Sequence, residues 1–161
     1  MNLRRRTTTI SHIYETMNTL SEISRWEIEK FGYTEWTFLK QCHELLDAEG
    51  VEIETVFEDD VPIVVAGTSP HAQDPGVRLV FVLAAQRFFD LGAPMVRYAR
   101  RQVRRVVDRR PGIEFRAYTA SPHPQCDRWL NLLGFYGPVV EDGMRTFVAY
   151  GKRRDDAKTK C

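Results

Sequence analysis

The sequence predicts an α/β domain of the α+β type, because its hydrophobic residues recur with two different periods along the chain. Apolar residues three and four positions apart predict helices, whereas apolar residues at every second position predict strands. The chain has 161 residues, 43% hydrophobic and 28% charged, and this composition is that of a globular protein rather than a disordered one. No apolar run approaches the roughly 18 residues of a membrane-spanning helix. We therefore expect a soluble protein.

One domain is expected over residues 1–152, followed by a polar tail over residues 153–161, because no repeat or linker interrupts the pattern. The basic N-terminus lacks the apolar core of a secretory signal, so we expect no signal peptide. The three cysteines are odd in number and far apart in the sequence. This spacing argues against a disulfide framework and predicts a reducing compartment.

In the N-terminal half, two amphipathic stretches precede two alternating ones. Thr34 is placed to cap the second helix, and Gly50 to end it. The expected elements are a strand over 3–9, one helix over 10–31, a second helix over 34–50, strands over 51–57 and 61–66, and a surface loop over 67–76.

In the C-terminal half, a nearly continuous apolar run predicts a buried strand over 77–84. Residues 92–94, Gly-Ala-Pro, are expected to open a helix with proline at its preferred first position, and the helix is expected to end at residues 109–112. A strand over 113–118 and a short helix over 124–133 follow, the latter closed by Gly134. An Asp-Gly pair at 142–143 predicts a terminal hairpin.

This order of elements is similar to that of the GCN5-related N-acetyltransferases (GNATs), and one local run strengthens the likeness. Residues 129–135, Trp-Leu-Asn-Leu-Leu-Gly-Phe, resemble the short fourth helix of that family with its Gly-Phe ending. The resemblance implies a mixed, mostly antiparallel central sheet flanked by about four helices. In active members it also implies acyl transfer from acetyl-CoA.

In the same family, a Gln/Arg-x-x-Gly-x-Gly/Ala turn binds the coenzyme diphosphate through backbone N–H groups at a helix N-terminus. Here Arg87 lies five residues before Gly92 instead of three, bulky Phe88 and Phe89 intervene, and Pro94 has no amide hydrogen. If acetyl-CoA binds, the resemblance places it at Leu91, Gly92, Ala93 and Val96.

The family's catalytic positions are also changed. Leu130 stands where the family often has a tyrosine general acid, and the strand over 77–84 contains no carboxylate. Tyr136 as acid, with Glu52 or Glu54 as a base acting through water, are the remaining candidates. We therefore expect a non-catalytic protein that works by contact and binds no cofactor; the alternative is an acetyl-CoA-dependent N-acetyltransferase.

Charge is segregated along the chain although the net charge is only +1. Residues 11–60 contain thirteen acids and three bases, and residues 87–116 contain nine arginines and three acids. The arginines of the predicted central helix share one face and predict a contact surface for other proteins in an assembly or for nucleic-acid phosphates. They are Arg97, Arg100, Arg101, Arg104 and Arg105, extended by Arg109 and Arg110. The alternative is that the acidic and basic segments neutralise each other.

A second, narrower resemblance covers residues 87–108 and 122–150. These stretches resemble small GNAT-like internal virion proteins of short-tailed phages in their altered phosphate turn, basic third helix and closing hairpin. That likeness implies a tail or internal core component with virion proteins as partners, located in the virion or the host cytoplasm. No metal site is expected, since His123 and Cys126 offer two ligands where structural zinc needs four.

Overall fold

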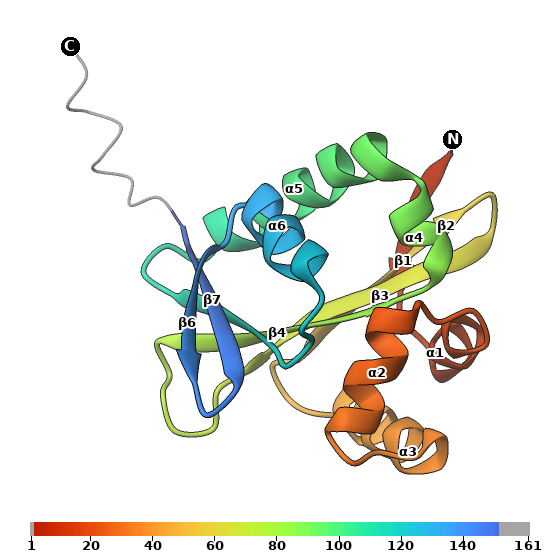
Figure 1. Cartoon of the computed structure of the whole chain (residues 1–161), viewed down its shortest axis with the longest axis horizontal. Coiled ribbons are helices and arrows are strands. Elements are labelled where there is room, and N and C mark those ends of the chain that lie inside the picture. The colour runs from red at the N-terminus through yellow and green to blue at the C-terminus, as the bar shows by residue number, and fades with distance from the viewer. Residues whose placement is uncertain (1, 152–161) are drawn as a thin grey trace. The chain divides into compact units, whose positions relative to one another are not determined.

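The computed structural model describes residues 2–151 and follows the expected order of elements with two additional helices (Figure 1). The elements are β1 (Leu3–Thr7), α1 (Ile10–Met17), α2 (Glu22–Lys30), α3 (Glu35–Leu46), β2 (Glu52–Glu58), β3 (Val61–Pro70), β4 (Val77–Ala84), α4 (Gln86–Asp90), α5 (Gly92–Asp108), β5 (Glu114–Thr119), α6 (Pro124–Leu133), β6 (Tyr136–Glu141) and β7 (Met144–Tyr150).

The strands form a seven-stranded sheet in the order β1-β2-β3-β4-β5-β7-β6. Strands β1 and β2, β2 and β3, β5 and β7, and β6 and β7 pair antiparallel. The mixed, mostly antiparallel sheet expected from the sequence is thereby confirmed, with six helices among the described residues in place of about four.

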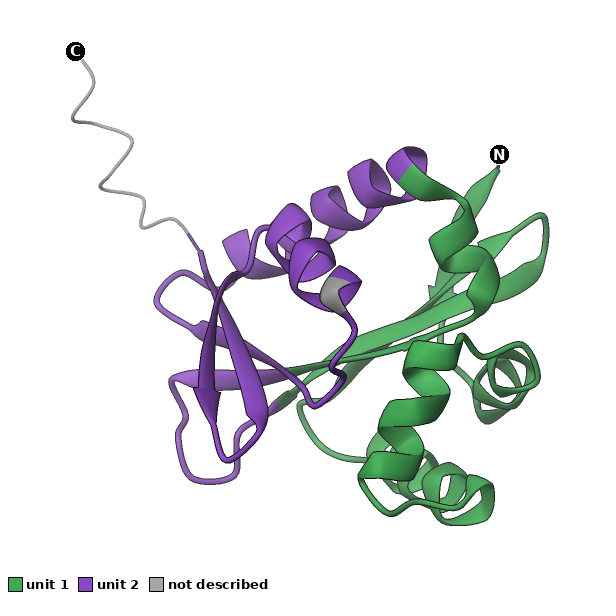
Figure 2. Cartoon of the chain, viewed as in Figure 1, with its two compact units in different colours: residues 1–69, 80–92 green, residues 70–79, 93–161 purple. Residues whose placement is uncertain are grey.

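The chain divides into two compact units (Figure 2). Unit 1 comprises residues 1–69 and 80–92, and unit 2 comprises residues 70–79 and 93–161. Each unit is described by itself below. The single domain over 1–152 remains a prediction, and the expected tail over 153–161 lies outside the described residues.

The core of unit 1 forms where α1 packs against β3 and β4. Ile13 and Met17 of α1 are buried with Val65 and Leu83 of the strands, and α2 and α3 add partly buried apolar residues to this cluster. The side chains that α3 contributes include Phe38, Leu39, Cys42 and Leu46, as the periodicity of that helix predicts. The packing therefore follows directly from the sequence pattern.

The single helix expected over 10–31 is wrong, because the structure breaks it into α1 and α2. Between them, Leu20 forms an isolated bridge with Ala85, and the Ser21 amide donates to the Ala84 carbonyl over 3.0 Å. Backbone groups used in this way are lost to a continuous helix. The Ser21 hydroxyl then accepts from the Ser24 amide at 3.1 Å and starts α2 as its N-cap.

The loop expected over 67–76 is partly wrong, since β3 continues to Pro70. Gly67 pairs with Ile53 of β2 inside this extension. A Cβ atom on Gly67 would lie 2.4 Å from the Glu52 carbonyl oxygen and 2.5 Å from Cζ of Phe81. The glycine therefore marks a close approach within the sheet rather than a flexible loop.

Helix α4 stands where the sequence predicts part of a phosphate turn. Phe88 is 3% exposed and anchors this short helix in unit 1. Arg87 donates from Nε and an Nη to the two carboxylate oxygens of Glu58, at 2.6 and 2.9 Å. These two hydrogen bonds hold the pKa of Glu58 below its usual value.

Unit 2 is built on β5, β7 and β6, with Phe115 and Phe147 almost fully buried. The predicted hairpin is confirmed: Asp142 and Gly143 have φ angles of 48° and 77°, which suit a tight turn between β6 and β7. Helix α6 ends at Gly134 (φ 104°), also as predicted. Strand β6, at the edge of the sheet, is exposed along its whole length.

Candidate functional site

The start of α5 is the position at which the sequence places a coenzyme, and its backbone is distinctive. Helix α5 has 17 residues and no acidic residue in its first turn. Gly92 has a left-handed φ of 56°, and apart from its chain neighbours and the backbone of α5 no atom lies within 4 Å of the position that a Cβ atom would occupy. Gly92 and Ala93 are exposed, whereas Leu91 and Val96 are half-buried.

The residues between Gln86 and Gly92 do not form the altered turn that their spacing suggested. They form α4, so Arg87 and Phe88 are engaged in unit 1 and do not lie in the turn that enters α5. The Asp90 carboxylate accepts a hydrogen bond from Gln86 Nε2 at 3.1 Å. The connection into α5 is therefore reduced to Leu91.

The three candidate acid–base residues are not brought together by any described contact. Glu54 forms an ion pair with Arg5 at 2.6 Å, and Glu52 is exposed on the same strand, β2. Tyr136 is 71% exposed on β6, where it pairs with Val148. Glu54 is thus already paired with a cation, and Glu52 also has a partner in the structure.

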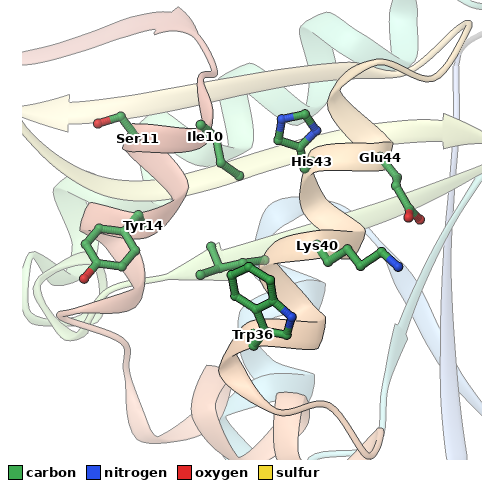
Figure 3. Close-up of a pocket in the computed structure, with 8 residues that line it drawn as sticks. Ile10, Ser11, Tyr14, Trp36, Lys40, His43 and Glu44 are labelled. Atoms are coloured by element: carbon green, nitrogen blue, oxygen red, sulfur yellow. The ribbon is translucent and has the colours of Figure 1, made fainter.

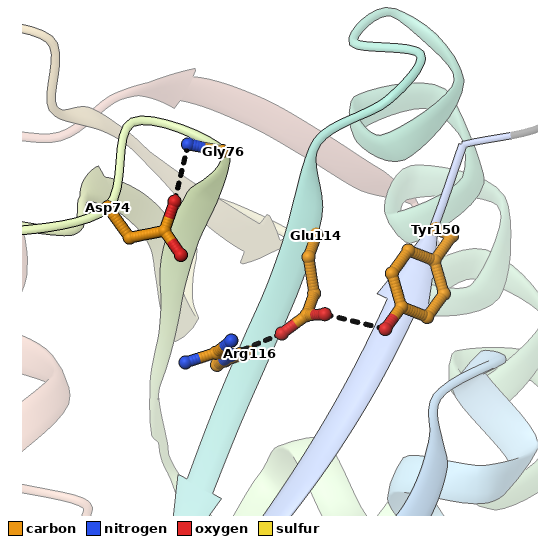
Figure 4. A network of polar contacts seen from close by, with 5 residues as sticks. All are labelled: Asp74, Gly76, Glu114, Arg116 and Tyr150. Atoms are coloured by element: carbon orange, nitrogen blue, oxygen red, sulfur yellow. Dashed lines mark hydrogen bonds and ion pairs between the residues drawn. The ribbon is translucent and has the colours of Figure 1, made fainter.

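A polar network in unit 2 was missed by the sequence reasoning (Figure 4). Tyr150 donates its hydroxyl to Glu114 at 2.6 Å, and Arg116 donates Nε to the other carboxylate oxygen. The Glu114 amide donates to the Gly76 carbonyl, and the Gly76 amide to Asp74, both at 2.9 Å. Glu114 and Arg116 share a strand face by their spacing, but Tyr150 joins them only through the β5–β7 register.

The network predicts how stability depends on pH. The hydrogen bond from Tyr150, with the Arg116 contact, holds the pKa of Glu114 below its usual value, and the same bond raises the pKa of Tyr150. Stabilisation through Glu114 is present above the pKa of an unfolded glutamate and is lost as pH falls through the lowered value. Stabilisation through Tyr150 is present below the pKa of an unfolded tyrosine and is lost as pH rises through the raised value.

Tyr150→Phe removes the hydrogen bond and the titrating hydroxyl. We therefore expect the variant to lose less stability at acid pH through Glu114, and to lose none at alkaline pH through residue 150. Urea unfolding midpoints measured from acid to alkaline pH in both proteins test this expectation. Profiles that differ only by a constant offset would show that the hydrogen bond does not couple the two titrations.

A surface groove of about 690 Å³ lies between α1 and α3 in unit 1 (Figure 3). Tyr14 and Trp36 are 51% and 76% exposed at its walls. Ile10 and Leu39 line it as well, and Lys40, His43 and Glu44 of α3 add polar groups to its lining. The surface of the groove is mainly apolar, and no catalytic role is assigned to its polar residues.

The described residues provide no metal cluster, and the Cys42 thiol is not activated as a nucleophile. No group of three or more His, Cys, Asp and Glu side chains among residues 2–151 could hold a metal ion. His123 caps α6, where its Nδ1 accepts from the Gln125 amide at 3.3 Å. Burial raises the pKa of the Cys42 thiol to about 11, which keeps it protonated near neutral pH. Within the same residues, no helix is both long and apolar enough to span a bilayer.

Searches for related sequences return nothing, since no protein-family model and no curated protein matches the chain. Solved structures do match. The GNAT domain of S. lividans PAT superposes with a TM-score of 0.70 at 13% identity, over 91% of this chain and 89% of that one. The fold is that of the GNAT acetyltransferases.

Other structures with the GNAT fold match over similar lengths. An acetyltransferase from Thermus thermophilus has a TM-score of 0.69 at 13% identity, over 92% of this chain and 97% of its own. The aminoglycoside acetyltransferase AAC(6')-Ib, in complex with ribostamycin and coenzyme A, has a TM-score of 0.66 at 19% identity, over 100% and 99%. The GNAT fold thus accounts for nearly the whole chain.

These GNAT structures correct two expectations. The sequence favoured a non-catalytic protein and no cofactor; both expectations are wrong, because the matched structures are acetyltransferases and several contain coenzyme A or acetyl-CoA. The narrower resemblance to internal virion proteins of phages finds no support among them.

Proposed function

We propose that the protein is an acetyl-CoA-dependent N-acyltransferase, which transfers an acyl group from a coenzyme thioester to an amine. The observation that supports this function best is the match over the full chain to GNAT-fold structures that contain coenzyme A. At these identities the match establishes the fold, and the activity is inferred from the start of α5 together with that fold.

The start of α5 fits a diphosphate. The amides of a helix's first turn have no acceptor within the helix, and the helix dipole favours an anion there. Pro94 has no amide hydrogen, so Gly92 and Ala93 are the donors that this turn can offer. Both are exposed, no acid lies in the turn, and the open space beside Gly92 allows a ligand to approach the backbone.

The coenzyme would supply the activated thioester, while the protein positions it and handles the protons. The Gly92 and Ala93 amides would hold the diphosphate, and Leu91 and Val96 would provide apolar contact beside it. An amine must lose a proton before it attacks the acyl carbon, and the departing thiolate must gain one. Tyr136 as acid, with Glu52 or Glu54 as a base acting through water, are proposed for these two transfers.

Isothermal titration calorimetry with acetyl-CoA tests the proposal. We expect saturable binding of one coenzyme per chain, with stabilisation against unfolding of about 2.7 kcal/mol at a ligand concentration about a hundred times Kd. Release of the free thiol in the presence of amines (a polyamine, an aminoglycoside and a peptide N-terminus) then tests turnover. Absence of both binding heat and thermal stabilisation at millimolar acetyl-CoA would refute the function.

A further inference from the structure

One side of α5 carries a row of exposed arginines that the proposed acyl transfer does not use. They recur at spacings of three and four, which places them on one helical face. We define the arginine face as the six exposed members, Arg97, Arg100, Arg101, Arg104, Arg105 and Arg109. The seventh predicted member, Arg110, is half-buried and has a partner in the structure, so it is excluded. At 1.5 Å per residue, the five members inside α5 extend about 12 Å along the helix, and Arg109 follows its last residue.

Five arginines outside the arginine face have carboxylate partners, whereas the six members of the face have none among residues 2–151. Arg5, Arg87 and Arg145 each form an ion pair at 2.6 Å, as does Arg6, and Arg116 pairs with Glu114. Within residues 2–151, none of the six arginines of the face makes an ion pair. The acids of unit 1 that do pair, such as Glu54 and Glu58, pair with bases of unit 1. Internal neutralisation by these contacts therefore leaves the face charged.

This concentration of like charge favours an external anion. The six arginines of the face carry six positive charges, and α5 contains one acidic residue, the exposed Asp108. Like charges four residues apart destabilise a helix by a few tenths of a kcal/mol per pair, and a bound polyanion reverses that term. All nine basic residues between 87 and 116 are arginine and none is lysine. The guanidinium fork binds phosphate oxygens through two hydrogen bonds, which a lysine ammonium does not do.

We propose that the arginine face binds the phosphate backbone of double-stranded nucleic acid. A duplex presents a dense line of phosphates along its length, and a row of arginines about 12 Å long on a rigid helix, extended by Arg109, can contact several of them at once. The exposed positions of α5 include no aromatic side chain on which unpaired bases could stack, so a single strand fits less well. Phosphate contacts position a protein without reading bases, and binding is independent of sequence.

Fluorescence anisotropy with a labelled DNA duplex of mixed sequence, titrated over a range of salt concentrations, tests this binding. Six phosphate contacts predict a slope of log K against log[salt] of about −5, at about −0.9 per contact. The variant R100Q/R101Q/R104Q is expected to reduce this slope to about −2.7 and to weaken binding at every salt concentration. Glutamine has nearly the helix propensity of arginine, so α5 itself is preserved.

The matched control is R4Q/R25Q/R128Q, which removes the same charge from three exposed arginines outside α5. It is expected to leave the slope close to that of the unaltered protein. The conservative variant R100K/R101K/R104K is expected to keep most of the slope with weaker affinity, because point charges remain while the forks are lost. Acetyl-CoA affinity should be unchanged in R100Q/R101Q/R104Q, since these residues lie two turns or more beyond Gly92.

Three outcomes would overturn the proposal. They are no DNA binding at low salt, an equal loss of binding in the α5 variant and its matched control, and stronger binding of the single strand than of the duplex. Sedimentation of the protein alone provides a further arm. If the protein binds no DNA but self-associates in a salt-sensitive way, and R100Q/R101Q/R104Q abolishes this self-association, the arginine face binds acidic residues of a second copy instead.

Discussion

Gly67→Ala is expected to destabilise the protein by about 2–3 kcal/mol, because β3 passes too close to β2 for any side chain at this position. The new Cβ atom would lie 2.4 Å from the Glu52 carbonyl oxygen, which belongs to the paired strand and has little freedom to move. Phe81 occupies the remaining space at 2.5 Å. Both neighbours would have to shift, and the Glu52 contact cannot be relieved by rotating a side chain.

The matched control is Gly76→Ala, where the nearest atom is the Asp74 Oδ1 at 3.2 Å and φ lies outside the left-handed region. That side chain can rotate, so we expect a change within about 0.5 kcal/mol. Urea unfolding of both variants measures the difference. Equal midpoints would mean that β2 and β3 are farther apart than the structure shows.

Gly92→Val is expected to weaken acetyl-CoA binding about tenfold or more. Gly92 enters α5 with a φ of 56°, a region that costs a residue with a Cβ about 1–2 kcal/mol and is worst for β-branched residues. Apart from the chain neighbours and the backbone of α5, no atom lies within 4 Å of the new Cβ position, so the effect is one of backbone conformation and not of collision with a packed neighbour. The first turn of α5 would reorganise, and its amides would no longer present the proposed diphosphate site.

Gly92→Asn separates backbone conformation from side-chain size, because asparagine tolerates the left-handed region. Calorimetry should find nearly unaltered acetyl-CoA affinity in Gly92→Asn and a large loss in Gly92→Val, with both variants folded by circular dichroism. Equal affinities in the two variants would remove Gly92 from the proposed site and leave the rest of the function to be tested by turnover.

Much of the architecture could be predicted from sequence because its signals are local. Thr34 caps α3 by accepting from the Thr37 amide, and the glycines at 134 and 143 adopt the left-handed φ that their turns require. Patterns of this kind depend on residues a few positions apart, so they can be interpreted without knowing the rest of the fold.

The errors arose where a long-range contact overrides a local pattern. The apolar periodicity of residues 10–31 continues through Leu20, yet α1 ends at Met17, and the Ser21 amide donates to the Ala84 carbonyl instead of continuing the helix. The salt bridge between Arg87 and Glu58 joins residues 29 positions apart and anchors α4. The spacing of Arg87 and Gly92 does not reveal that helix. Because the residues of α4 were counted as part of the turn, the start of α5 was not expected to bind a coenzyme. A pairing between distant strands likewise explains why the sequence does not link Tyr150 to Glu114.

Strand β6 has a consequence for the behaviour of the protein at high concentration. An uncovered edge strand is a template on which another chain can add a strand. In β6, the exposed apolar side chains of Val139 and Val140 (61% and 60% exposed) would favour such an association. Pro138 lies within it and has no amide to donate, and the register with β7 shifts between Tyr136 and Val139. The missing donor and the irregular register interrupt the hydrogen-bonding ladder that a growing fibril would need, so this border of the sheet is protected by its backbone rather than by charge.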